Sequence, residues 1–168
     1  LYHNLGLEGG PNFRWQYKTI ADCTNAIKLN PSEVSYYNKR GNTYFEKNQF
    51  DEAIIDYTKV IELNPRNARA YSQRGLPYFL KGEYDKAIDD FSKAIELNPD
   101  FAGAYYFRGM VQLHTQEWSK VKEDLNIAKD MGVNIVDTVP YIYRSVENCE
   151  QIIGVKLPEE IAALLMQP

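Results

Sequence analysis

A short motif recurs in this chain with a fixed period. The segments AIKLNP, VIELNP and AIELNP end at Pro31, Pro65 and Pro99, so that successive prolines are 34 residues apart. Residues 34–67 and 68–101 are identical at about half of their positions. Self-similarity at such a period indicates repeated supersecondary units, each of which buries its apolar face against the next. The chain is therefore predicted to be an array of stacked units.

Each unit is predicted to contain two helices joined by a tight turn. Segment 34–47 carries aromatic and small residues at helical spacing, and segment 50–63 places its apolar residues on one face. The Asn-Pro pair at 64–65 ends the second helix, because a residue before proline avoids the helical region. Residues 102–135 continue the same order with more departures.

This order resembles the tetratricopeptide repeat family, whose pattern asks for aromatic, Gly, Tyr, Ala, aromatic, Ala and Pro residues along each unit. The first complete unit provides Tyr37, Gly41, Tyr44, Ala53, Tyr57, Val60 and Pro65. The second provides Tyr71, Gly75, Tyr78, Ala87, Phe91, Ala94 and Pro99. The third provides Tyr105, Gly109, Gln112, Val121, Leu125 and Ala128, and lacks the proline. The resemblance implies an all-α fold: a right-handed α–α superhelix (tetratricopeptide repeat solenoid) with C-terminal capping helices.

The predicted domain organisation follows the repeat. It comprises a degenerate or truncated N-terminal repeat, two regular units, an eroded unit and a helical cap: residues 1–33, 34–67, 68–101, 102–135 and 136–168. Because the chain begins at Leu1 and not at Met, we expect a processed form or a fragment, with preceding repeats or domains left open.

The last repeat of an array needs a cover for its apolar face. Segment 131–140 is predicted to be an extended connection, 141–154 a helix closed by Gly154, and the segment after Pro158 a last short helix. The apolar residues expected to cover the last repeat are Ile152, Ile153, Ile161, Leu164 and Leu165. The alternative for these helices is a second binding surface.

Charge and motif content exclude several function classes. A net charge of −4 argues against general nucleic-acid binding, and no apolar run approaches the roughly 18 residues of a membrane span. Cys23 and Cys149 are too few for a disulfide framework, so buried free thiols and a cytoplasmic location are expected. His3 and His114 cannot complete a zinc site, and no catalytic motif is present. We therefore predict no enzyme activity, no cofactor and no metal.

Two charged series recur at fixed positions of the units. Arginine is found at residues 40, 74 and 108, and aspartate at residues 56, 90 and 124. An arginine series could bind an acidic partner through charge-assisted hydrogen bonds. The alternative is that the aspartates of the second helices pair with the arginines inside the stack, which we favour.

In the resembled family, the first helices of successive units line a concave face that holds a segment of another protein. The positions carried over to this chain are Asn38, Asn42, Phe45, Arg69, Leu76, Phe79, Leu80, Tyr106, Met110, Leu113 and His114. We call these eleven residues the predicted partner face. Its N-terminal part is polar, with amides able to bond a peptide backbone, and its C-terminal part is apolar. The alternative is that the C-terminal helices fold back and bury the apolar part.

One subtype of the family binds the acidic C-terminal tails of heat-shock chaperones through a Lys-x-x-Gly-Asn signature and later cations. The corresponding run here is NKRGN, in which only Gly41 and Asn42 match. Gly103 and Phe107 stand where the later cations are needed. A charge clamp for a carboxylate tail is therefore not expected.

Pro77 stands inside the first helix of the second unit, where proline removes one backbone donor at a cost of about 3 kcal/mol. The repeat register on both sides predicts that the helix persists. We expect it to bend, releasing the carbonyl of Gln73 to water or to a side chain. Either the bend widens the groove or the proline is simply tolerated there.

The sequence thus predicts a scaffold or adaptor that binds a protein or peptide segment, with no nucleic acid and no membrane insertion. Two alternatives remain open. The first is a self-associating module that forms a homo-oligomer through its N-terminal edge or its apolar groove. The second is an accessory binding module of a larger enzyme.

Overall fold

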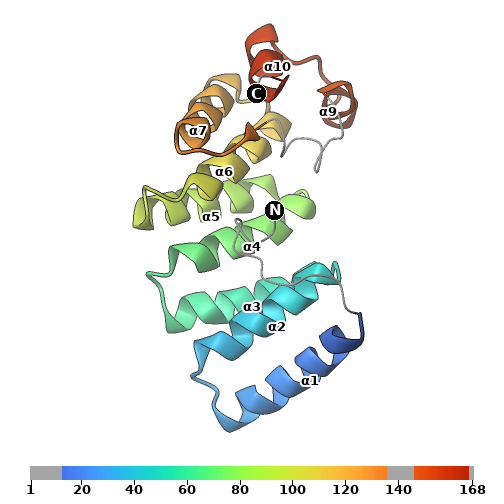
Figure 1. The fold of residues 1–168 in the computed structure, drawn as a ribbon, viewed down its shortest axis with the longest axis vertical. Helices are drawn as coiled ribbons and strands as arrows, with labels where there is room; N and C mark the ends of the chain where they lie inside the picture. Colours follow the sequence, from blue (N-terminus) through green and yellow to red (C-terminus); the bar gives the residue numbers. More distant parts are fainter. Residues whose placement is uncertain (1–12, 136–145, 167–168) are drawn as a thin grey trace. The chain divides into compact units, whose positions relative to one another are not determined.

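A computed structural model describes residues 13–135 and 146–166 of the chain, and every regular element in these ranges is an α-helix (Figure 1). The helices group into two compact units, which divide after Glu83. The division falls inside residues 68–101, because the first helix of that repeat belongs to unit 1 and its second helix to unit 2. The all-α prediction is confirmed.

Unit 1 contains α1 (Phe13–Leu29), α2 (Val34–Glu46), α3 (Phe50–Leu63) and α4 (Ala68–Leu80). Each helix packs on the next along the chain. The α2 and α3 helices occupy the two segments in which the sequence predicts helices. The core residues of this unit include Tyr37, Ala53, Tyr57, Val60 and Ala70, all buried.

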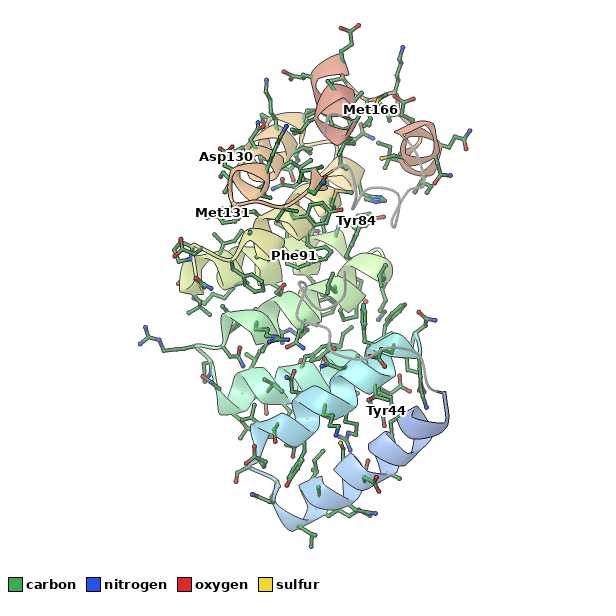
Figure 2. The ribbon with its side chains drawn as sticks, viewed as in Figure 1. Tyr44, Tyr84, Phe91, Asp130, Met131 and Met166 are labelled. Atoms are coloured by element: carbon green, nitrogen blue, oxygen red, sulfur yellow. The ribbon has the colours of Figure 1, made fainter. Side chains whose placement is uncertain are left out.

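Unit 2 contains α5 (Tyr84–Leu97), α6 (Ala102–Thr115), α7 (Trp118–Asp130), α9 (Val146–Ile153) and α10 (Glu159–Met166). Its α6 helix packs on both α5 and α7, and α10 packs on α7 and α9. Two aromatic rings join α5 to α6: Phe91, labelled in Figure 2, stacks on Phe107 with a centroid distance of 5.8 Å.

The turn inside each repeat needs one residue in the left-handed region. Asn48, Gly82 and Gln116 hold this position, with φ of 59°, 75° and 59°, and they are spaced by the repeat period. The next residue donates its N–H to a carbonyl five residues earlier, as in Gln49→Tyr44 at 2.9 Å. This backbone hydrogen bond closes the end of the first helix, because it satisfies a carbonyl oxygen that has no partner within the helix.

Replacing Gln116 by glycine is expected to raise the free energy of unfolding by about 1 kcal/mol, because glutamine is strained at positive φ and glycine is not. Urea unfolding followed by circular dichroism measures the change. Gly82→Gln, the reverse change at the equivalent position, should destabilise the protein by a similar amount. Equal stabilities for Gln116→Gly and the wild type would contradict the strain argument.

Two glycines let the paired helices approach closely. A Cβ atom added at Gly41 would lie 2.9 Å from the ring of Tyr57, and one added at Gly109 would lie 2.9 Å from a methyl group of Leu125. Both glycines stand at the same repeat position, on α2 and α6. The aromatic or aliphatic side chain of the second helix therefore fills the space that a Cβ atom would need.

The C-terminal helices confirm part of the predicted cover. Gly154 ends α9 with φ of 74°, and α10 begins directly after Pro158. Ile161 and Leu165 are buried, whereas the expectation for Ile152 was wrong, because 53% of its surface is exposed. The segment 136–145 and the end of the chain from 167 lie outside the described residues, as do residues 1–12 of the predicted N-terminal repeat.

The helix α4 runs unbroken through Pro77, as the repeat register predicts. Pro77 is buried, and its carbonyl still accepts a hydrogen bond from the N–H of Lys81 at 3.0 Å. Proline therefore removes one backbone N–H donor from the helix, while the hydrogen bond of the following turn still forms. The bend in α4 and the release of the Gln73 carbonyl stay predictions.

Candidate protein-interaction face

The part of the predicted partner face that lies in unit 1 comes from α2 and α4. Asn38, Asn42 and Phe45 on α2 are partly exposed, as is Leu76 on α4. Arg69 and Leu80 are exposed, and Leu80 keeps 53% of its surface in solvent. Phe79 was also predicted to lie on this face, but it is only 7% exposed and belongs to the core. We call the six accessible residues the α2–α4 face.

A hydrogen-bond cluster holds these two helices together. The side-chain oxygen of Asn42 accepts from the hydroxyl of Tyr57 at 2.9 Å and from Nε2 of Gln73 at 2.8 Å. The three residues come from α2, α3 and α4, so one side-chain oxygen joins three helices. Tyr57 is 1% exposed, and this burial raises the pKa of its hydroxyl, which therefore stays protonated.

Gln73 was not predicted to take part in the site. The equivalent positions of the other units hold Lys39 and Phe107, so the repeat pattern carries no signal for a buried amide there. Tyr57 was named only as an aromatic residue of the family pattern. A tyrosine at a buried aromatic position needs a partner for its hydroxyl, and that requirement is the available clue.

The apolar side chains of the α2–α4 face lie toward the C-terminal ends of their helices. Leu76 and Leu80 are one helical turn apart on α4, and the ring of Phe45 on α2 lies 5.7 Å from that of Phe50. Beyond Leu80, Lys81 binds the carboxylate of Asp51 at 2.5 Å. The apolar side chains of Leu76 and Leu80 on α4 are thus followed directly in sequence by a paired charge.

The part of the predicted partner face that lies in unit 2 is mostly buried. Tyr106, Met110 and Leu113 keep 2%, 0% and 0% of their surface exposed. The sequence left open whether these residues contact a partner or are covered internally, and their burial favours internal coverage. The equivalent residues of α2 are Asn38, Asn42 and Phe45, which are partly exposed, so the two helices differ at matched positions.

His114 is the member of this part that keeps some exposure. Its Nδ1 atom lies 3.0 Å from the hydroxyl of Tyr84, and the two rings are 4.9 Å apart. Tyr84, labelled in Figure 2, begins α5, whereas His114 lies in the last turn of α6. Burial lowers the pKa of His114 below its ordinary value of 6.5, so the imidazole is neutral at neutral pH.

This lowered pKa predicts a loss of stability on mild acidification. The unfolded chain binds a proton at His114 more readily than the folded chain, so the free energy of unfolding should fall as the pH falls through 6.5. Urea unfolding at about pH 8 and about pH 5.5 measures this slope. In His114→Gln the slope over this interval should be smaller, since glutamine does not titrate. Identical slopes would show that other groups cause the effect.

The arginine and aspartate series pair inside the units, as we favoured. Arg40 binds both oxygens of Asp56 at 2.8 and 2.7 Å, and Arg108 binds both oxygens of Asp124 at 2.7 Å. The alternative, in which these two arginines grip an acidic partner, was wrong, because their guanidinium groups are occupied. Both aspartates are buried.

Each arginine also reaches the second helix of the preceding repeat. Arg40 donates to Thr24, Arg74 to Thr58 and Arg108 to Ser92, at 3.0 to 3.1 Å. The hydroxyl partner always precedes the arginine by 16 residues, and the paired aspartates at 56 and 124 follow it by 16. This constant spacing shows that the arginines orient successive helices.

The described ranges contain neither a cluster of metal ligands nor a membrane-spanning helix. No group of three or more His, Cys, Asp or Glu residues there could hold a metal ion. Among the same residues, no helix combines the length and the apolar character that crossing a bilayer requires. Cys23 and Cys149 are free and buried, as predicted, and burial raises the pKa of the Cys149 thiol to about 11.

Comparison with protein families gives two matches to sequence models. The model described as Tetratricopeptide repeat matches residues 68–101, and the one described as TPR repeat matches residues 41–79. A search of curated protein sequences found no match.

Solved structures with the same fold include several repeat proteins. A structure described as the crystal structure of MamA is 26% identical, covers 87% of this chain and 82% of its own, and has a TM-score of 0.67. The TPR2B domain of yeast Sti1, in its complex with pHsp70, is 26% identical, with coverage of 72% of this chain and 93% of its own and a TM-score of 0.57. The first TPR of Spaghetti (RPAP3), bound to HSP90 peptide SRMEEVD, is 25% identical, with the same coverage and a TM-score of 0.61.

These matches agree with the all-helical fold of consecutively packed helices described above. The sequence prediction of the family is confirmed, and the chain is a tetratricopeptide repeat protein.

Proposed function

We propose that this chain is a protein-interaction module that holds a segment of a partner protein on the α2–α4 face. The observation that carries the proposal is the bond from Gln73 to Asn42, at 2.8 Å, which sets the first helices of two successive repeats side by side. The resulting surface combines polar amides with the exposed side chain of Leu80. Two of the similar structures are complexes, one with pHsp70 and one with the HSP90 peptide SRMEEVD, and this supports a peptide-binding role.

The chemistry of the face favours a partner segment with apolar side chains. Leu76, Leu80 and Phe45 supply apolar surface, and Asn38 and Asn42 supply amides that can bond a peptide backbone. An acidic tail is disfavoured, since Arg40 is occupied by Asp56 and uncharged residues stand at the later clamp positions. The proposed role is binding, with no catalysis.

Leu80→Glu is expected to abolish partner capture without loss of fold, because this side chain is 53% exposed and a carboxylate there would oppose an apolar partner. The measurement is a pull-down from the lysate of the source cell, read by mass spectrometry. Ile55→Glu is the matched control, since Ile55 is 66% exposed on α3, outside the predicted partner face. Circular dichroism checks that both variants keep the helical content of the wild type.

Proteins captured by the wild type and by Ile55→Glu, but lost with Leu80→Glu, would support the α2–α4 face. Equal capture by all three baits would overturn the proposal. Recovery of the bait protein alone would favour self-association, and size-exclusion mass measurement at two concentrations would then test it.

A further inference from the structure

The side-chain amide of Asn42 has its oxygen fully used inside the protein. Tyr57 and Gln73 both donate to this oxygen, at 2.9 and 2.8 Å. A carbonyl oxygen has two lone pairs, and two donors fill them. The oxygen of Asn42 is therefore not free to accept from a partner.

The buried hydroxyl of Tyr57 decides which way this amide is turned. Tyr57 is 1% exposed, and Asn42 is the hydrogen-bond partner that its hydroxyl has among the described residues. If the amide were reversed, its NH₂ group would face Tyr57, and the hydroxyl proton would lose its acceptor. A buried donor without an acceptor is strongly unfavourable, so the oxygen must face Tyr57.

The NH₂ group of Asn42 consequently lies on the other side of the amide. No described residue accepts a hydrogen bond from it, and it is not among the buried polar atoms of the described ranges that lack a partner. The Asn38 oxygen, one turn earlier on α2, is buried without a hydrogen-bond partner among the described residues, so Asn38 gives no support for this orientation. The amide of Asn42 thus turns its oxygen inward, which leaves its NH₂ group as a donor at the surface.

We propose that Asn42 acts on the α2–α4 face as a hydrogen-bond donor only, held in this orientation by Tyr57 and Gln73, and that the partner presents a main-chain carbonyl oxygen to it. This inference rests on the proposed function. A two-way pairing between the amide and a peptide unit is excluded, because the oxygen is filled.

The orientation is tested first by NMR on the 168-residue chain without a partner. The side-chain NH₂ signals of Asn42 are identified by their loss in Asn42→Asp, and their exchange with water is measured. The expected result is fast exchange in the wild type. In Tyr57→Phe with Gln73→Glu, both donors are gone and an acceptor takes their place, so the amide should reverse and exchange about tenfold more slowly.

The equivalent position in the next repeat shows that the Tyr57→Phe part of this variant is compatible with the fold. Phe91 stands there in place of tyrosine and is fully buried, so the fold accepts phenylalanine at this position. Tyr57→Phe alone should therefore keep the helical content. Slow exchange of the Asn42 NH₂ protons in the wild type would overturn the inferred orientation.

The role toward a partner is tested with short peptides selected from a displayed random library on the wild-type chain. Fluorescence anisotropy should show affinity reduced about tenfold in Asn42→Ala and in the reversed variant. Replacing main-chain carbonyls one at a time by methylene groups should find one position with a similar loss. That loss should be absent when the same peptide is measured against Asn42→Ala.

The remaining outcomes separate the competing explanations. In a further experiment, Asp and Glu of the peptide are changed to Asn and Gln. If this change lowers the affinity and no main-chain position is sensitive, the acceptor is a carboxylate and the main-chain assignment is overturned. Unchanged affinity in Asn42→Ala would overturn the donor role. If no peptide binds the wild type, the proposed function and the donor role fail together, while the exchange measurement still decides the orientation.

Discussion

Replacing Arg108 with methionine is expected to lower the free energy of unfolding by about 3 kcal/mol. The side chain of Asp124 is 3% exposed and receives two charge-assisted bonds from Arg108, at 2.7 Å. Removing the arginine leaves a buried carboxylate without its counter-charge, which is far more costly than losing an exposed pair. The same change also removes the bond to Ser92, so α5 and α6 lose one contact. Urea unfolding followed by circular dichroism measures the effect.

Two further variants identify the cause of this loss. Lys93→Met breaks an exposed pair with Glu96, in which the side chains are 40% and 66% exposed, and should cost less than about 1 kcal/mol. Arg108→Met combined with Asp124→Leu removes both charges and should recover most of the stability. If the double variant is as unstable as the single one, lost packing and not an unpaired charge is responsible.

Gly41→Ala is expected to destabilise the protein by about 2 kcal/mol, although alanine favours a helix by about 1 kcal/mol over glycine. The added Cβ atom would lie 2.9 Å from the Tyr57 ring and 3.2 Å from the Cβ of Asp56. Neither neighbour can move freely, because the Tyr57 hydroxyl is bound to Asn42 and the Asp56 carboxylate to Arg40. The midpoint of urea unfolding reports the change.

Gly103→Ala is the matched control for this prediction. Gly103 is also helical, but the nearest atom to its added Cβ is in the ring of Phe101 at 3.4 Å, which is ordinary contact. This variant should be as stable as the wild type or slightly more stable. A similar loss in both variants would show that the distance between α2 and α3 is not the cause.

The secondary structure was predictable because its signals are local and repeated. The helix pairs follow from the apolar spacing, and the ends of the second helices follow from the Asn-Pro pairs. The pairing of Arg40 with Asp56 was also accessible, since two opposite charges recur at matched positions. Repetition gave each of these interpretations more than one instance.

The candidate site was predictable only in part. Asn42 was identified from its repeat position, but its hydrogen bonds to Tyr57 and Gln73 join residues 15 and 31 positions away. Met110 was placed on the partner face by the same rule and is fully buried. Repeat position tells which face of a helix a residue occupies, whereas burial depends on what the rest of the chain places against that face.

The sequence by itself determined that the chain is a helical repeat and where the two helices of a repeat unit lie. Those properties depend on neighbours within one period, and the 34-residue spacing exposes them. The tertiary structure alone decided that the oxygen of Asn42 is filled, that Tyr106 and Leu113 are buried, and that Ile152 is exposed. These properties depend on contacts between helices, and the side chains that make them follow no common period.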